Sequence, residues 1–216
     1  MSIRSLAALA AVAALTAASS FNLLILSTSS ETTVAGGSGT DSRLVGTGGN
    51  YQGLYKILWA EDANIPCYFR VYSRHLNQDG SQQDEANLGA SSCDETSNSE
   101  RSAGFNTPGM YVNGIAVCRN NQRIKGIKLH YADVGPNGTV TPQNQFDQGT
   151  QPNCTLSGYL GETQGTWSAS RMCPTGMIAN QIRVHFRPEN PIGFTTAIKQ
   201  SATGISLLCR RVEVKS

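Results

Sequence analysis

The chain has 216 residues, of which 15% are charged, and its formal net charge at pH 7 is +2. This length is enough for one globular domain with a substantial core. The low charge, with no block of like charges, argues against nucleic acid as a partner. The 22 glycines, together with many Ser, Thr, Asn and Gln residues, are typical of short strands joined by turns, so the composition predicts an all-β protein.

Residues 1–29 read as a secretory signal peptide. "MSIR" supplies a positive charge, and "SLAALAAVAALTAASS" is an apolar segment that ends in small residues. We expect cleavage between Ala17 and Ser30. The apolar run from Leu6 to Leu26 is long enough to span a bilayer, so an uncleaved signal anchor is the alternative. Both readings place the rest of the chain outside the cytoplasm. Cleavage would give a secreted protein with no membrane contact.

Residues 30–50 are rich in Gly, Ser and Thr and predict a flexible linker. The folded domain is then expected over residues 51–216. Its first two strands are predicted at "LYKILWA" and "CYFRVYSR", because aromatic and β-branched residues suit a half-buried sheet. The polar stretch from Leu76 to Pro108 is long for a loop in a compact domain, which makes it a candidate functional loop.

The six cysteines form an even set without any C-x-x-C pair, which favours disulfides over zinc or redox chemistry. Their spacing leaves 15 pairings open. We predict one of them, Cys173 with Cys209, because these residues flank the two ends of what reads as a closed strand unit. Asn137 and Asn153 lie in Asn-x-Ser/Thr sequons and are candidate glycosylation sites of a glycoprotein.

An internal repeat is the most informative pattern in the chain. "VNGIAV" at 112–117 aligns with "ANQIRV" at 179–184, and "IKGIKL" at 124–129 aligns with "ATGISL" at 202–207. The strand period of two predicts one inward face in each segment. The residues expected on it are Ile115, Val117, Ile127, Leu129, Ile182, Val184, Ile205 and Leu207. The glycine before the isoleucine is expected to let the backbone bulge or bend there without a Cβ clash, and repetition itself is typical of repeat-built folds.

The segment "GTWSASRMCPTGMIANQIRVHFRPENPIGFTTAIKQSATGISLLC", Gly165 to Cys209, resembles the repeat of the vitelline membrane outer layer protein I family. The shared features are Gly-x-Trp, a Cys-Pro-x-Gly turn, an alternating strand, and Gly-Ile-x-Leu followed by Cys. The resemblance implies a β-prism of three Greek-key sheets, with residues 51–72 as a degenerate first sheet. It also implies a secreted coat or matrix protein, and the more distant jacalin-type prisms are sugar-binding lectins.

Catalytic and metal-binding motifs are absent from the sequence. There is no H-E-x-x-H, no G-x-S-x-G and no glycine-rich phosphate loop, and His75, His130 and His185 are scattered. The acidic neighbours Glu61 and Asp62 would point to opposite faces of a strand, so they would not converge on a glycosidic bond. We therefore expect no catalytic residues, no metal and no cofactor.

Three functions are compatible with these patterns. The leading prediction is a non-enzymatic extracellular structural or coat protein, whose partners would be extracellular matrix, cell-surface glycans or further copies of itself. The first alternative is a lectin-like module, in which Trp167 or Tyr159 stacks on a sugar ring, although packing between the repeats is the slightly favoured role for Trp167. The second alternative is a hydrolase or transferase acting on glycans.

Overall fold

The computed structural model describes residues 23–46, 49, 51–62, 65–76, 88–91, 100–148, 154–158, 161–189 and 199–214. All regular structure in these residues is β-strand, as the composition predicts. Within the same residues, no helix is long and apolar enough to cross a membrane. The segment assigned to the signal peptide before Leu23 lies outside the described residues.

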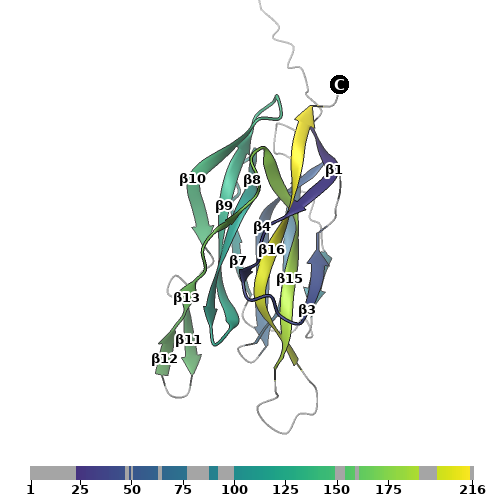
Figure 1. Ribbon diagram of the computed structural model, residues 1–216. Helices are drawn as coiled ribbons and strands as arrows, with labels where there is room; N and C mark the ends of the chain where they lie inside the picture. The colour runs from purple at the N-terminus through teal and green to yellow at the C-terminus, as the bar shows by residue number, and fades with distance from the viewer. Residues whose placement is uncertain are drawn as a thin grey trace, which may run out of the picture.

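The described strands form three larger antiparallel sheets and one separate hairpin (Figure 1). Sheet A contains β1 (Leu23–Glu31), β16 (Lys199–Val214), β15 (Met177–Glu189) and β3 (Asp41–Val45) in that spatial order, and β2 (Ala35–Gly36) also pairs with β16. Sheet B contains β6 (Leu88–Ser91), β5 (Ile65–His75), β4 (Gln52–Asp62) and β7 (Arg101–Gly104). Sheet C contains β10 (Val140–Gln148), β9 (Arg123–Val134), β8 (Met110–Asn120) and β13 (Thr166–Trp167), with β14 (Arg171–Met172) also paired to β8. The hairpin is β11 (Thr155–Gly158) with β12 (Gly161–Gln164).

Each larger sheet has Greek-key order around a central hairpin. The hairpins are β4–β5, β8–β9 and β15–β16, with a third strand beside the second and a fourth beside the first. Sheets B and C take their outer strands from the chain that follows the hairpin. Sheet A takes β1, β2 and β3 from the N-terminal segment instead, so both ends of the described chain meet in one sheet. The prediction of an all-β, disulfide-stabilised fold of three Greek-key sheets is confirmed.

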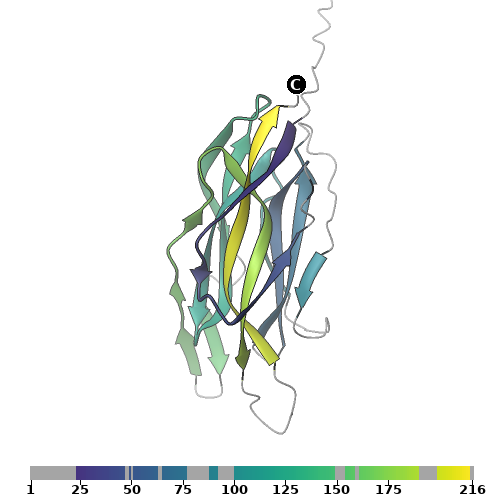
Figure 2. The same cartoon turned by 45° about the vertical axis from the view of Figure 1, so that its right-hand side comes forward.

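The three sheets enclose one core. Strand β15 packs against both β4 and β8, and β4 also packs against β8, so every sheet contacts the other two. The principal buried cluster contains Val184 from sheet A, Ile57 and Phe69 from sheet B, and Ile115 and Ile127 from sheet C. The strands run along the length of the molecule (Figure 2). The inward-facing residues predicted from the repeat are all fully buried.

The hairpin registers show three copies of the repeat, the two aligned in sequence and the degenerate one expected at residues 51–72. The first strand of each hairpin carries one extra residue at an equivalent bulge, occupied by Tyr55, Asn113 and Asn180. The second strand carries another at Cys67, Lys125 and Thr203. The predicted alignments are therefore in register in space, and sheet B supplies the third copy. The bulged residues Lys125 and Thr203 directly precede Gly126 and Gly204, in agreement with the bulge predicted at these glycines. At Gly204, a Cβ would collide with the backbone of Gly37 and the side chain of Val34.

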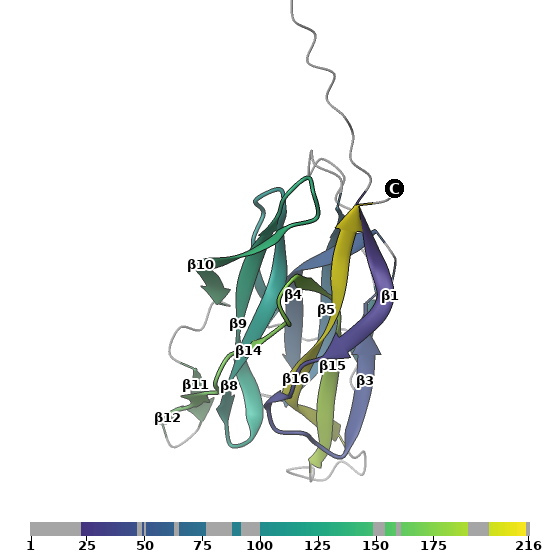
Figure 3. The same cartoon turned by 45° about the horizontal axis from the view of Figure 1, so that its top comes forward.

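The segment predicted as a flexible linker, residues 30–50, contains the end of β1 and the strands β2 and β3 of sheet A. Leu23 and Ile25 are buried, and β1 pairs with β16 from Leu23 to Glu31. Figures 2 and 3 show the purple β1 lying against the yellow β16. The domain therefore includes residues before Tyr51. The segment forms ordered strands because sheet A gives its backbone hydrogen-bond partners, which composition alone does not reveal.

Polar side chains fasten this N-terminal segment to the sheet. Glu31 Oε1 accepts hydrogen bonds from Ser206 Oγ at 2.5 Å and from Arg183 Nε at 3.0 Å. His185 Nδ1 lies 2.9 Å from the Ser38 carbonyl oxygen. Burial lowers the pKa of His185 below its ordinary value, against the opposing effects of the Ser38 bond and the Glu31 charge. His185 is thus a structural residue of this contact.

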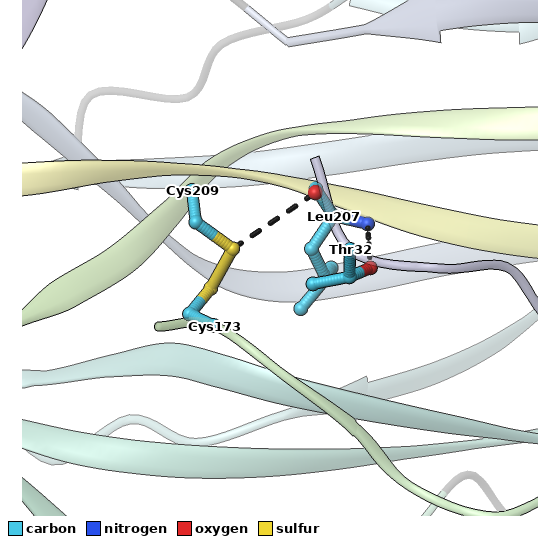
Figure 4. The surroundings of a disulfide bond; sticks show 4 residues. All are labelled: Thr32, Cys173, Leu207 and Cys209. Atoms are coloured by element: carbon cyan, nitrogen blue, oxygen red, sulfur yellow. Dashed lines mark hydrogen bonds between the residues drawn. A yellow bond between two sulfur atoms is a disulfide. The ribbon is translucent and has the colours of Figure 1, made fainter. Parts of the chain in front are cut away.

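Disulfide bonds link the sheets and the chain segments that connect them. Cys173, which follows β14, is bonded to Cys209 of β16 with a Cα–Cα distance of 5.6 Å, as the sequence analysis expected (Figure 4). Beside it, the Leu207 N–H donates to Thr32 Oγ1 at 3.0 Å. A second bridge joins Cys118 of β8 to Cys154, just before β11. Such bonds persist in oxidising compartments, in agreement with the predicted location outside the cytoplasm.

The Cys173–Cys209 bridge ties sheet C to sheet A, so its removal should loosen the contact between them. Replacing both residues by serine is expected to lower the free energy of unfolding by about 2–5 kcal/mol. Chemical denaturation monitored by circular dichroism would measure the change, with the exposed Thr175→Ser substitution as the neighbouring control. An unchanged midpoint in the double variant would contradict this role.

Candidate functional site

A groove of about 280 Å³ opens beside the tip of the β8–β9 hairpin, where β13 pairs with β8. It is called the Trp167 groove below. Most of its lining belongs to sheet C and the chain beside it, while β2 of sheet A contributes a glycine. The lining residues are Gly36, Arg119, Gln122, Thr166, Trp167, Ser168 and Arg171.

The hairpin tip forms one wall of this groove. Asn121 and Gln122 both have positive φ, 47° and 66°, as a two-residue type I′ turn requires. Arg187 of β15 holds the turn by donating to Gln122 Oε1 at 2.6 Å and to the Asn121 carbonyl at 3.2 Å. Glu189 in turn accepts bonds from Arg187 and Arg123 at 3.0 Å. Burial raises the pKa of Glu189, but these arginines outweigh it, so the pKa lies below its ordinary value and the carboxylate stays ionised.

Trp167 forms another part of the lining and is half-buried. A Cβ on Gly126 would lie 3.2 Å from the indole Cη2, a tight contact, so the ring packs closely on this glycine. The Lys128 ammonium lies 4.8 Å from the ring centroid, a cation–π distance. Ser168 fixes the next position, since its N–H donates to the Val117 carbonyl at 2.8 Å. The ring therefore has the packing role considered from the sequence and also lines the groove.

The segment 165–172, which carries Trp167 and is called the strap below, is anchored through a disulfide bond. Trp167 pairs with Cys118, and Cys118 is bonded to Cys154. The Gly165 N–H donates to the Cys154 carbonyl at 2.9 Å, and a Cβ on Gly165 would collide with the Cys154 sulfur. The disulfide and this glycine therefore hold the base of the strap against β8.

Two arginines give the groove its charge. Arg119 reaches toward the N-terminal segment, since a Cβ on Gly37 would lie 2.8 Å from its Nη1. Arg171 has a buried Nε with no hydrogen-bond partner. Neither guanidinium forms an ion pair or a side-chain hydrogen bond with another residue in the part of the chain that the structure describes. Since no lining residue is acidic, the groove is positively charged.

Sequence reasoning found Trp167 but missed Arg119, Arg171 and Gln122. A signal for Arg119 exists in the repeat, because Glu61 and Phe186 occupy its position in the other two copies. The change from an acidic or aromatic residue to arginine marks the sheet C copy as different. No comparable pattern in the sequence points to Gln122 or Arg171.

The remaining predicted site residues are not brought to the groove. Asn137 is exposed in the turn between β9 and β10, where its Oδ1 accepts the Thr139 N–H at 3.1 Å. Tyr159 and Asn153 lie outside the described residues, as does most of the polar stretch proposed as a functional loop. No cluster of metal-ligating side chains occurs among the residues that are described.

Two other polar clusters deserve comparison with catalytic arrangements. Glu61 is buried between sheets, with Lys125 Nζ at 3.0 Å and Arg101 Nη1 at 2.9 Å, so it serves as the anion of an ion-pair network. Burial lowers the pKa of Lys125, and Glu61 opposes this effect. Separately, His130 Nε2 lies 2.8 Å from Ser170 Oγ at the surface. Burial and then the Lys128 charge lower the pKa of His130 below its ordinary value.

Comparisons with known proteins leave the family open. No family model and no curated protein matches the chain. Among solved structures, the biofilm matrix protein Bap1 of V. cholerae is similar at 10% identity and a TM-score of 0.41. The match covers 89% of this chain and 27% of Bap1, so the chain spans about a quarter of that protein's length.

The packing of the Trp167 indole on Gly126 can be tested directly by mutation. Gly126→Val should push the indole off sheet C, because the added methyl groups need the space that the ring occupies, at a cost of about 1–3 kcal/mol. Quenching of tryptophan fluorescence by acrylamide should increase, since Trp59 is fully buried and the change would report on Trp167. Gly126→Ala should give a smaller increase. Unchanged quenching in a folded Gly126→Val protein would mean that the ring does not rest there.

Proposed function

We propose that this protein is a secreted, non-enzymatic structural protein of an extracellular coat or matrix, and that it attaches to glycans through the Trp167 groove. The observation that supports this proposal is the set of side chains that line the groove. An indole, the Gln122 amide and two guanidinium groups line one concave site, beside a Ser168 hydroxyl that is hydrogen-bonded to the Val117 N–H and the Ala169 carbonyl. Apolar surface combined with a few convergent hydrogen-bonding groups is the usual make-up of a small-ligand site. A sugar ring fits it by placing its C–H face on the indole and its hydroxyls against the polar groups.

The rigidity of the surroundings supports the same proposal. The disulfide Cys118–Cys154, the type I′ turn and the Arg187 bonds hold the walls before any ligand arrives. A preformed site loses less conformational entropy on binding. The resemblance of residues 165–209 to the vitelline membrane outer layer protein I repeat also favours a coat protein. Self-association into a layer is part of this proposal, and Tyr159 is a second stacking candidate.

A glycan-active hydrolase is the alternative, and the Ser170–His130 contact is the observation that favours it. A hydroxyl within hydrogen-bond reach of an imidazole is the first element of an activated nucleophile. The coat proposal predicts that a fluorophosphonate probe leaves Ser170 unlabelled. Labelling that is lost in Ser170→Ala and in His130→Ala would favour the hydrolase.

Binding of the secreted full chain to a glycan array tests the proposal. We expect saturable binding to at least one glycan class, weakened about tenfold or more by Trp167→Ala, which corresponds to about 1.4 kcal/mol or more. Tyr51→Ala is the matched control, because Tyr51 is exposed and does not line the groove. Circular dichroism would verify that both variants are folded. Absence of binding to any glycan, or binding that Trp167→Ala leaves intact, would contradict attachment through this groove.

A further inference from the structure

We propose that the Trp167 groove is specific for acidic glycans, and that Arg119 and Arg171 together bind the carboxylate or sulfate group of a sugar unit. This inference rests on the proposed function, since it names the class of glycan that the same groove would take. It adds two binding residues that the sequence analysis did not find.

The first argument is that the two arginine side chains lack an anionic partner among the described residues. Neither guanidinium has an anionic partner among the described residues, and the buried Nε of Arg171 has no acceptor. Buried N–H donors are normally satisfied, and an unsatisfied one requires an explanation. An acid group entering the groove would supply acceptor oxygens where the protein provides none.

The second argument is the contrast with the neighbouring arginines. Arg123 and Arg187 lie next to the groove wall, and both are neutralised by Glu189 at 3.0 Å. Arg101 is likewise paired with Glu61 at 2.9 Å. Each of these three arginines therefore has a carboxylate partner within the fold. Arg119 and Arg171 are left without one at the place where the surface is hollowed.

The third argument is the match between the ligand and the arrangement of the groove. A guanidinium presents its N–H donors in a planar fork, which fits a carboxylate or sulfate better than an ammonium does. Arg119 ends the part of β8 that pairs with β13, and Arg171 lies on β14, which pairs with β8 further along. Trp167 lies on the same strap as Arg171, and its strand β13 pairs with β8 next to Arg119. An acidic pyranose could thus place its ring on the indole while its charged substituent lies between the arginines. Lys128 beside the indole adds positive charge.

The test is a binding titration of the secreted full chain with three matched oligosaccharides. These are an oligouronate, the same oligouronate with its carboxylates methyl-esterified, and an oligosaccharide without carboxylates that carries sulfate esters. We expect at least one of the two anionic ligands to bind about tenfold or more tightly than the esterified one. The ligand that binds more tightly distinguishes carboxylate from sulfate recognition.

Variants then assign the preference to the two arginines. Arg119→Gln and Arg171→Gln should each reduce it, and the double variant should bind the anionic and esterified ligands about equally. Arg119→Lys and Arg171→Lys should lose part of it, because they keep the charge without the fork. Arg211→Gln is the matched control, since it removes one exposed positive charge outside the groove. Melting temperatures would verify folding, and the lysine variants serve if a glutamine variant does not fold.

The outcomes separate this inference from the proposed function. Equal binding of the anionic and esterified ligands would overturn acid specificity but leave glycan attachment standing. A preference lowered as much by Arg211→Gln as by the groove variants would also overturn it, because general electrostatic attraction would then explain the result. Failure to bind any of the ligands, or any glycan on an array, would overturn both.

Discussion

The structure depends on the closure of sheet A by strands from the N-terminal segment. The β15–β16 hairpin presents one edge to β1 and β2 and the other to β3. Without these strands both edges would expose unpaired backbone groups, and part of the core would be open to water. Because each of the three sheets buries its inner face against the other two, the loss of one sheet would affect the whole core. The disulfide from Cys173 to Cys209 adds a covalent link at this sheet.

The closure also bears on the candidate site. Strand β2 contributes Gly36 to the groove, and a Cβ there would approach Val117 Cγ2 to 2.8 Å. The N-terminal segment thus passes so close to β8 that only small residues fit. Arg119 lies beside it, next to Gly37. The basic groove is therefore a junction of sheets A and C, and its geometry requires that both be complete.

The sequence predicted those features that repeat locally. The alternation around Ile115, Ile182 and their equivalents predicted the buried faces, and the aligned segments proved to be in spatial register. The copy in sheet B was harder to recognise because Trp59 and Phe69 replace the smaller aliphatic residues of the other copies. The strand β1 was missed because its buried residues Leu23 and Ile25 belong to an apolar run that was interpreted as part of a signal segment. Its polar end, at Glu31, attaches to the sheet through contacts that leave no hydrophobic period.

The candidate site was predictable only in part for a related reason. Trp167 lies in a recognisable motif, whereas Arg119 and Arg171 belong to separate strands and are ordinary surface residues when read in isolation. Their significance comes from two properties of the folded chain. One is the shared groove, and the other is the absence of a carboxylate partner where neighbouring arginines have one. Neither property is encoded by a local pattern.

The most direct measurement of the closure compares the chain beginning at Leu23 with the chain beginning at Tyr51, by hydrogen exchange and thermal unfolding. The account predicts that the shorter chain loses amide protection along β15 and β16 and unfolds at a markedly lower temperature or without cooperativity. Addition of a peptide covering residues 23–46 should restore part of the protection. An equally stable shorter chain, with protected β15 and β16 amides, would contradict the central role of the N-terminal strands.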